Sequence, residues 1–447
     1  MRRSLPSPQP NIPGRGILAG YSARFWASLI IVGVSAGLAA AGFIALLNLV
    51  ERVAWQRPAH EFLAAVSAAS ATRRVLVLLL AGVIAAAGTF LVRRLRQSGG
   101  GEVSEAIWLG DARLELVPSI VRGLLSIVTV GMGASLGREA APQLAGAAVA
   151  SELCERSKGV ITPAQRRLLV AAGAGAGMAA VYNVPLGGAL FALEVLLGTL
   201  ALPLVLPALL TSLIATAVAW IVIPTGPTYV IGAFHVSAAE VVWAALVGPI
   251  AGLLAVAWVR LVTLANRIRP ARRAIRLAAP IVIFAALGAL AIRYPQLLGN
   301  GKDLAQLAFV GKLSLGLFAA LMVLKPLATA ACLASGSPGG LFTPTLALGV
   351  LFGAMLGHAW GELWPGSPVG SYALIGGGAV LAAAMQGPLA ATVLMLELTH
   401  SPGTLTVPLL LAVAEATVLA RLLNSPSIYS ARLADPHWCP PPLEAAG

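Results

Sequence analysis

Four carboxylates in this sequence stand inside strongly apolar segments. They are Glu139, Glu194, Glu397 and Glu415. If these segments cross a lipid bilayer, inserting an unpaired carboxylate costs at least about 2.5 kcal/mol, which makes a functional role the default hypothesis for such a residue. Intramembrane carboxylates mark ion pathways and proton relays, and each of the four is therefore a candidate functional group.

Each carboxylate also has a structural interpretation. The positive end of a helix could stabilise Glu139, but that does not account for the glycine-rich residues around it, and a functional role is favoured. Glu194 and Glu397 end apolar segments, and for them both bonding to nearby backbone or hydroxyl groups and proton transfer remain open. For Glu415, pairing within a dimer and exposure to a water-filled crevice are both open.

An internal repeat relates residues 182–194 to residues 385–397. Proline, leucine and glutamate coincide, and the offset is constant because 388 − 185 and 397 − 194 both give 203. The same offset relates two glycine-led starts of apolar segments, Gly137-Arg138-Glu139 and Gly340-Leu341-Phe342. We therefore predict two corresponding halves with matching helix starts.

Matching helix starts can form an anion site. A helix N-terminus carries about half a positive charge and several unpaired N–H donors, so it binds anions without lysine or arginine. Repeats in transporters are often inverted, which brings broken helices of both halves together near the bilayer midplane. The repeat suggests this inversion and predicts an anion site where the starts meet.

The composition requires lipid around the chain. Hydrophobic residues make up 58% and charged residues 11% of the 447 residues, and the mean hydropathy is +0.88. Four segments are long enough to cross a hydrocarbon core of about 30 Å, namely residues 26–50, 75–92, 202–223 and 241–262. Residues 186–200 and 389–398 are shorter and begin near glycine or proline, so we predict helices that end inside the membrane.

The basic residues indicate membrane topology rather than nucleic-acid binding. The net charge is +13, but arginines cluster between apolar segments, within 93–96 and 267–276, as is typical of loops that face the cytoplasm. Residues 1–24 lack the apolar core of a cleaved signal. The three cysteines and five histidines have no spacing typical of a disulfide framework or a metal site.

As a set, these motifs resemble those of the CLC family of chloride channels and transporters. Residues 137–139 are similar to the start of its GREGP motif and residues 340–344 to its GxFxP motif, while Tyr429 is similar to its anion-facing tyrosine. The resemblance covers about residues 26–433. It implies an all-α integral membrane fold of many tilted, partly broken helices in two inverted-topology halves, assembled as a homodimer with one pore per subunit.

The resemblance also implies roles for individual residues. Glu139 would be the gate, whose carboxylate occupies an anion position when deprotonated and swings away when protonated or displaced. The residues expected to bind the anion are Gly100, Gly101, Gly137, Arg138, Glu139, Gly340, Leu341, Phe342 and Tyr429. Glu194 would provide a possible proton route. No cofactor is implied, and chloride is the transported ion.

The expected organisation follows the repeat. Residues 1–24 would form a cytoplasmic N-terminal segment, 25–224 the first membrane half, 225–433 the second half, and 434–447 a cytoplasmic tail without the regulatory domains that many family members carry. We expect a multi-pass protein of the cell inner (plasma) membrane with both termini in the cytoplasm. Its expected partners are chloride or a similar small anion, membrane lipid and a second copy of the chain, and no nucleic acid.

Three departures from the family's motifs bear on mechanism. Gly100 stands in place of the anion-contacting serine of the GSGIP motif, which residues 99–103 match best. The proline of GREGP comes one residue later, as Pro142, where it still suits the first turn of a helix. Val195 stands where coupled chloride/proton antiporters carry a second glutamate.

Three functions compete on this evidence. A membrane-embedded enzyme is least favoured, because the 17 acidic residues include no DxxD or HExxH pairing and no credible Ser/His arrangement accompanies them. Val195 favours a voltage- or glutamate-gated chloride channel with weak or no proton coupling. A chloride/proton antiporter is the alternative.

Overall fold

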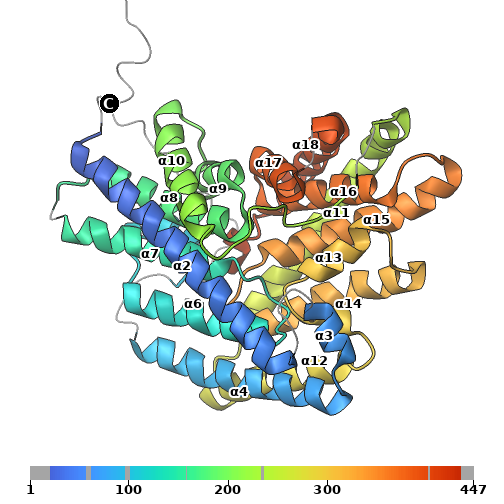
Figure 1. Cartoon of the computed structure of the whole chain (residues 1–447), viewed down its shortest axis with the longest axis horizontal. Helices are drawn as coiled ribbons and strands as arrows, with labels where there is room; N and C mark the ends of the chain where they lie inside the picture. Colours follow the sequence, from blue (N-terminus) through green and yellow to red (C-terminus); the bar gives the residue numbers. More distant parts are fainter. Residues whose placement is uncertain are drawn as a thin grey trace, which may run out of the picture.

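The computed structural model describes residues 21–56, 62–95, 101–157, 159–232, 236–400 and 403–433. These residues are mostly helical and form no strand (Figure 1). In the first half the elements are α2 (Ala23–Trp55), α3 (Phe62–Ala68), α4 (Ala71–Leu95), α5 (Val103–Leu109), α6 (Leu116–Gly131), α7 (Ala140–Arg156), α8 (Pro163–Tyr182), α9 (Pro185–Leu190), η2 (Phe191–Leu197) and α10 (Leu202–Ala219). In the second half they are α11 (Ala238–Arg267), α12 (Arg273–Leu290), η3 (Pro295–Leu297), α13 (Lys302–Phe309), α14 (Leu315–Ala334), α15 (Phe342–Leu363), α16 (Val369–Met385), α17 (Pro388–Thr399), η4 (Gly403–Leu405), α18 (Thr406–Leu422) and η5 (Ser430–Arg432).

Among the described residues, seven helices are long and apolar enough to cross a membrane. They are α2, α4, α10, α11, α12, α14 and α15. The spans predicted at residues 26–50, 75–92 and 241–262 lie within α2, α4 and α11, so these predictions are confirmed. The span predicted at 202–223 begins with α10 but runs beyond it. That helix ends at Ala219, shortly before Pro224 and Gly226, which favour a turn.

The two short helices predicted from the repeat are α9 and α17. Each short helix follows a longer one that ends at a residue in the left-handed backbone conformation. These residues are Asn183, with φ 58°, after α8 and Gln386, with φ 59°, after α16. Pro185 and Pro388 then begin the short helices. Proline suits a first turn because the N–H it lacks would have no partner inside the helix. Sequence positions 203 residues apart therefore produce the same local structure in both halves.

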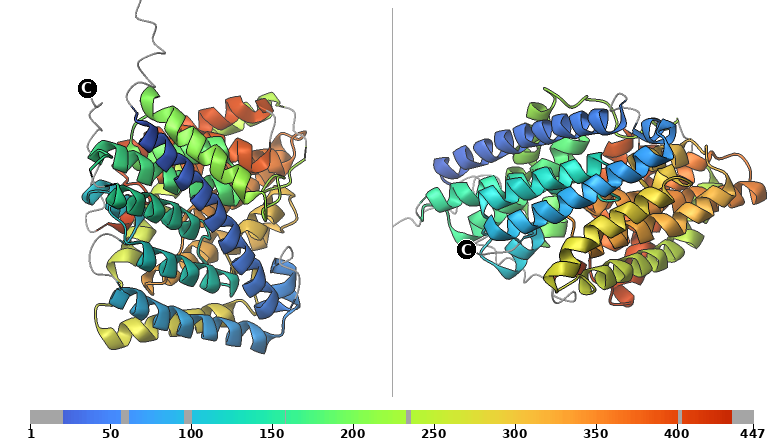
Figure 2. Two further views of the ribbon diagram at one scale, coloured as in Figure 1. Left: turned by 60° about the vertical axis from the view of Figure 1, so that its left-hand side comes forward. Right: turned by 90° about the horizontal axis from the view of Figure 1, so that it is seen from below.

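The two halves lie side by side, and two pairs of helices make most of the contact between them. Figure 1 places α2, α6, α7 and α8 of the first half on one side and α13, α14, α15 and α16 of the second half on the other. Helix α4 of the first half packs along α12 of the second, as the view from below in Figure 2 shows, and α9 packs against α17. The halves thus form one body with an interface between them.

In each half, two helices at corresponding positions of the repeat pack backbone to backbone through glycine. In α7 and α8 these are Gly146 and Gly173, and a Cβ added to Gly173 would lie 2.4 Å from the carbonyl oxygen of Gly146. In α15 and α16 they are Gly349 and Gly376, and a Cβ on Gly349 would lie 2.9 Å from the carbonyl oxygen of Gly376. Small residues drive helix association in membranes because close packing replaces the missing hydrophobic force.

We predict that Gly173→Ala destabilises the protein, because the added methyl group would force α7 and α8 apart. Overpacking of this kind costs about 1–3 kcal/mol. The measurement is the thermal midpoint of the purified protein in detergent, which should fall by several degrees. Gly42→Ala in α2 is the matched control, because its added Cβ meets no atom within 4 Å. Equal melting of both variants would show that the α7–α8 contact is not tight.

Candidate functional site

The loops that precede α7 and α15 cross where the two halves meet. Gly137 and Gly340 form an antiparallel bridge, in which the N–H of Gly137 donates to the carbonyl oxygen of Gly340 at 2.7 Å and the N–H of Gly340 donates back at 2.8 Å. A Cβ at Gly137 would lie 2.1 Å, and one at Gly340 1.9 Å, from Oε1 of Glu139. Both positions therefore require glycine while the carboxylate of Glu139 lies over the bridge.

Glu139 is buried and fully engaged by hydrogen-bond donors. Its Oε1 accepts from the backbone N–H of Phe342, the first residue of α15, at 2.8 Å. Its Oε2 accepts from the hydroxyl groups of Tyr182 at 3.0 Å and Thr343 at 3.2 Å, and these two hydroxyls also contact each other. The carboxylate thus occupies a position at the start of a helix that suits any small anion.

The structure confirms that a helix starts beside this carboxylate. Helix α7 begins at Ala140, directly after Glu139, and Pro142 lies in its first turn. The altered order of residues after Glu139 therefore does not disturb the helix start, since a proline in a first turn removes no hydrogen bond of the helix.

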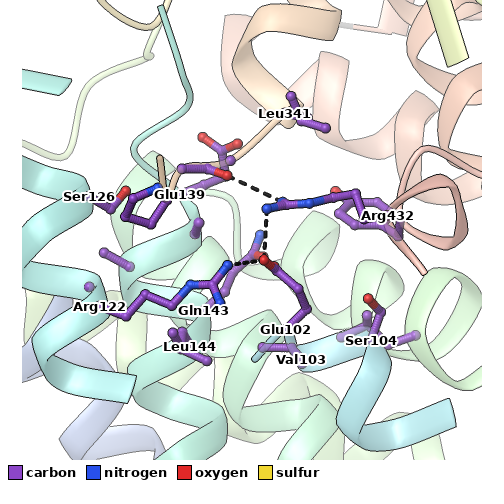
Figure 3. A pocket seen from close by; sticks show the side chains of 18 of the residues that line it. Glu102, Val103, Ser104, Arg122, Ser126, Glu139, Gln143, Leu144, Leu341 and Arg432 are labelled. Atoms are coloured by element: carbon purple, nitrogen blue, oxygen red, sulfur yellow. Dashed lines mark hydrogen bonds and ion pairs between the residues drawn. The ribbon is translucent and has the colours of Figure 1, made fainter. Parts of the chain in front are cut away.

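A small cavity of about 40 Å³ lies beside Glu139 (Figure 3). Its walls include Gly340, Leu341 and Tyr429 together with Ser126 and Gln143. One water needs about 10–15 Å³ of such space, so the cavity has room for one small ion or a few waters. The hydroxyl of Tyr429 lies 3.8 Å from Sδ of Met385, which leaves it without a strong partner among the described residues.

Two larger cavities flank this site. One, of about 440 Å³, is lined by Arg138 and by Tyr182, whose hydroxyl contacts Glu139 from the other side. The guanidinium carbon of Arg138 lies 5.4 Å from the centre of the Tyr182 ring, and its Nε has no hydrogen-bond partner in the described structure. The other, of about 610 Å³, is lined by Gly101, whose N–H donates to the Glu105 carboxylate at 2.8 Å.

The residues expected to bind an anion therefore fall into three groups. The site around Glu139 includes Gly137, Gly340, Leu341, Phe342 and Tyr429. Arg138 and Gly101 lie in the walls of the two flanking cavities. Gly100 lies outside the described residues.

Sequence reasoning did not identify the two hydroxyl groups that bind Glu139. Thr343 directly follows Phe342, so its place in the second glycine-led motif was the available signal. Tyr182 lies 43 residues from Glu139. No spacing in the sequence pairs the two, because only the packing of α8 against α7 brings the end of α8, where Tyr182 lies, to the start of α7.

Glu194 and Glu397 each bind the start of a helix in the opposite half, and we call these two side chains the braces. Glu194, in η2, accepts from the N–H groups of Leu389 at 3.2 Å and Ala390 at 2.5 Å at the start of α17. Glu397, in α17, accepts from Leu186 at 3.1 Å and Gly187 at 2.7 Å at the start of α9. Each carboxylate caps the helix of the opposite half, which favours the structural interpretation for both. The proton route through Glu194 stays a prediction.

Glu415 lies in α18, on the side that packs against α11. Its Oε2 is buried without a hydrogen-bond partner among the described residues, and a Cβ on Gly248 of α11 would lie 2.3 Å from it. Nothing in this environment assigns it a role.

The chain is similar to a known family over most of its length. Residues 81–421 match the family model described as voltage gated chloride channel. The chain is 35% identical over 369 residues to a ClcB-like chloride channel protein of Ralstonia nicotianae, covering 80% of this chain and 83% of that protein. It is 30% identical to the voltage-gated ClC-type chloride channel ClcB of Salmonella typhimurium, covering 91% of this chain and 98% of that protein.

Two solved structures share the fold. A slow cyanobacterial Cl⁻/H⁺ antiporter superposes with a TM-score of 0.80 at 21% identity, over 92% of this chain and 97% of that chain. A CLC-type fluoride/proton antiporter superposes with a TM-score of 0.73 at 20% identity, over 91% of this chain and 97% of that chain. The prediction of an all-α membrane fold in two inverted halves is confirmed.

We predict that Glu194→Gln and Glu397→Gln each lower the thermal midpoint in detergent, and by similar amounts. Each variant replaces a carboxylate that accepts two charge-assisted hydrogen bonds with an amide that has a single acceptor oxygen, so one N–H group at the helix start loses its partner, which costs on the order of 1 kcal/mol. Glu362→Gln, at an exposed position near the end of α15, is the control and should melt like the wild type. A large effect of one variant and none of the other would contradict the equivalence of the braces.

Proposed function

Because this chain belongs to the voltage-gated chloride channel family, we propose that it carries chloride and similar small anions across a lipid membrane through the site around Glu139. The observation that carries this proposal is the contact between the Glu139 carboxylate and the first N–H group of α15. A negatively charged side chain there holds the place that a mobile anion would take.

In this mechanism Glu139 is the gate. When its carboxyl group is protonated or displaced, the N–H of Phe342 and the hydroxyl groups of Tyr182 and Thr343 become available to an anion. These neutral donors suit conduction, because an ion must be held weakly enough to leave again. The hydroxyl of Tyr429 supplies a further donor on the side of the small cavity.

The flanking cavities supply the two approaches to this gate. Arg138 attracts anions into the cavity of about 440 Å³. The cavity of about 610 Å³ is lined by Arg93, Arg269 and Arg276, which come from both of the basic segments of the sequence. We assign this end to the cytoplasm, because loops rich in arginine remain on that side of a membrane.

Within this function we favour a channel with weak or no proton coupling. Val195 cannot hold a proton, and the neighbouring Glu194 is engaged by two N–H groups at the start of α17. The second candidate is a chloride/proton antiporter, which the descriptions of the two solved structures of this fold favour.

We further propose that the protein is a multi-pass homodimer in the bacterial inner membrane with both termini in the cytoplasm. Similarity to the bacterial ClcB proteins supports the membrane, and the family resemblance supports the dimer. Transport requires no cofactor in this proposal, since the site itself supplies every donor that contacts the anion.

We predict that purified protein in liposomes releases chloride, and that Glu139→Gln removes the dependence of the efflux rate on pH. A neutral amide resembles the protonated carboxyl group and cannot titrate. Efflux is measured with a chloride electrode between acidic and neutral pH, with Glu362→Gln as the control. Absence of efflux for chloride, bromide, nitrate and fluoride alike would refute the transport proposal. An unchanged pH–rate curve in well-folded Glu139→Gln would refute the gating role.

We also predict that a proton gradient does not drive chloride against its own gradient. The test records external pH and chloride together, before and after addition of a potassium ionophore. In a channel the reversal potential equals the chloride Nernst value, whereas in an antiporter it shifts by an amount set by the exchange ratio. Proton movement in fixed ratio to chloride would establish the antiporter, and its loss in Glu194→Gln would then identify Glu194 as the proton route.

A further inference from the structure

Glu102 lies between two arginines that come from distant parts of the chain. Its Oε1 accepts a hydrogen bond from Nη2 of Arg432 at 2.7 Å and also contacts Nη2 of Arg122 (Figure 3). Arg122 belongs to α6 and Arg432 to η5, three residues after Tyr429. We name Glu102, Arg122 and Arg432 the inner cluster.

The carboxylate of Glu102 binds the arginines of this cluster and does not cap the helix that follows it. Glu102 is the residue directly before α5, where a carboxylate commonly accepts a hydrogen bond from the first turn, yet its side chain makes no such bond. The carboxylate is directed at the two guanidinium groups. Its position is therefore set by the arginines and not by capping.

The inner cluster separates two of the cavities. All three of its residues line the small cavity beside Glu139, and all three also line the arginine-rich cavity of about 610 Å³. Nη1 of Arg432 also donates to the carbonyl oxygen of Gly339 at 3.3 Å, next to the glycine bridge. An anion that moves between the large cavity and Glu139 therefore passes the cluster.

The cluster has more positive charge and more donors than Glu102 satisfies. Two guanidinium groups face one carboxylate, and the side chain of Arg432 is only 7% exposed. Its Nε is buried and has no hydrogen-bond partner in the described structure. A buried charge that is incompletely paired is costly, and a second anion at this place would remove part of that cost.

We propose that Arg122 and Arg432 form an anion-binding site on the path to Glu139, and that Glu102 is the resident carboxylate with which the transported anion competes. This inference rests on the proposed function and extends it, because it adds a charged site to the neutral one. A carboxylate of the protein would then occupy the position of a transported anion at two places, which are the site around Glu139 and the inner cluster with Glu102. The ligand is a small monovalent anion such as chloride or bromide.

The test measures chloride binding to purified protein in detergent by calorimetry. Glu102→Gln removes the competing charge, so chloride should bind about tenfold more tightly than to the wild type, which is the scale of one charge-assisted hydrogen bond. Glu105→Gln is the matched control: it removes one negative charge from the wall of the same large cavity without touching either arginine. It should change the affinity far less.

A second variant locates the effect. Glu102→Gln combined with Arg432→Gln should lose the gain, since one of the two guanidinium groups is then absent. Glu102→Asp, which keeps the charge but shortens its reach, should bind chloride with intermediate affinity and provides the readout if Glu102→Gln does not fold. If the inner cluster is only a structural ion pair, Glu102→Gln and Glu102→Asp will lower the melting temperature without tightening chloride binding, and the proposal is overturned.

The binding test separates this inference from the proposed function. Wild-type protein that releases chloride from liposomes, together with Glu102 variants that bind it no more tightly than Glu105→Gln, retains the transport proposal and refutes the inner site. Tighter binding by Glu102→Gln in a protein that moves no anion retains the site and refutes transport.

Discussion

The structure depends on the crossing of two loops at Gly137 and Gly340. Two backbone hydrogen bonds of 2.7 and 2.8 Å hold these loops together, and they fix the starts of α7 and α15 beside each other. The same crossing leaves no room for a Cβ, because the carboxylate of Glu139 lies against both glycines. Without this approach of backbone to backbone, the first N–H of α15 could not reach a side chain of the other half.

Around this crossing the fold is nearly symmetric, but the chemistry is not. Glu139 and Phe342 occupy corresponding positions of the repeat, yet one provides a carboxylate and the other a backbone N–H that binds it. By contrast, the corresponding positions 194 and 397 are both glutamate, and each carboxylate accepts hydrogen bonds from the start of a helix in the other half. The two halves are thus chemically alike where Glu194 and Glu397 join them, and they differ at the crossing, where we propose that a single anion position forms.

The two carboxylates on the path that we propose illustrate different ways of holding a negative charge inside a membrane protein. Glu139 is held by one N–H group and two hydroxyl groups, which are neutral, so little charge attraction opposes its release. Glu102 is held by two arginines, whose attraction is stronger and whose positive charge remains in part when the carboxylate is bound. In our proposal the first arrangement suits a gate and the second suits the collection of anions from the cytoplasmic side.

The sequence by itself determined the membrane environment, the repeat, most helix starts and the candidate role of Glu139. Composition, the repeat with its offset of 203 residues, and proline or glycine at fixed positions can all be read along the chain without knowledge of how its helices pack. Only the tertiary structure decided that Tyr182 and Thr343 bind Glu139, that Glu194 and Glu397 cap each other's halves, and that Glu102 lies between Arg122 and Arg432. Glu102 and Arg432 are 330 residues apart, and such pairs follow from how the helices pack and not from any periodicity along the chain.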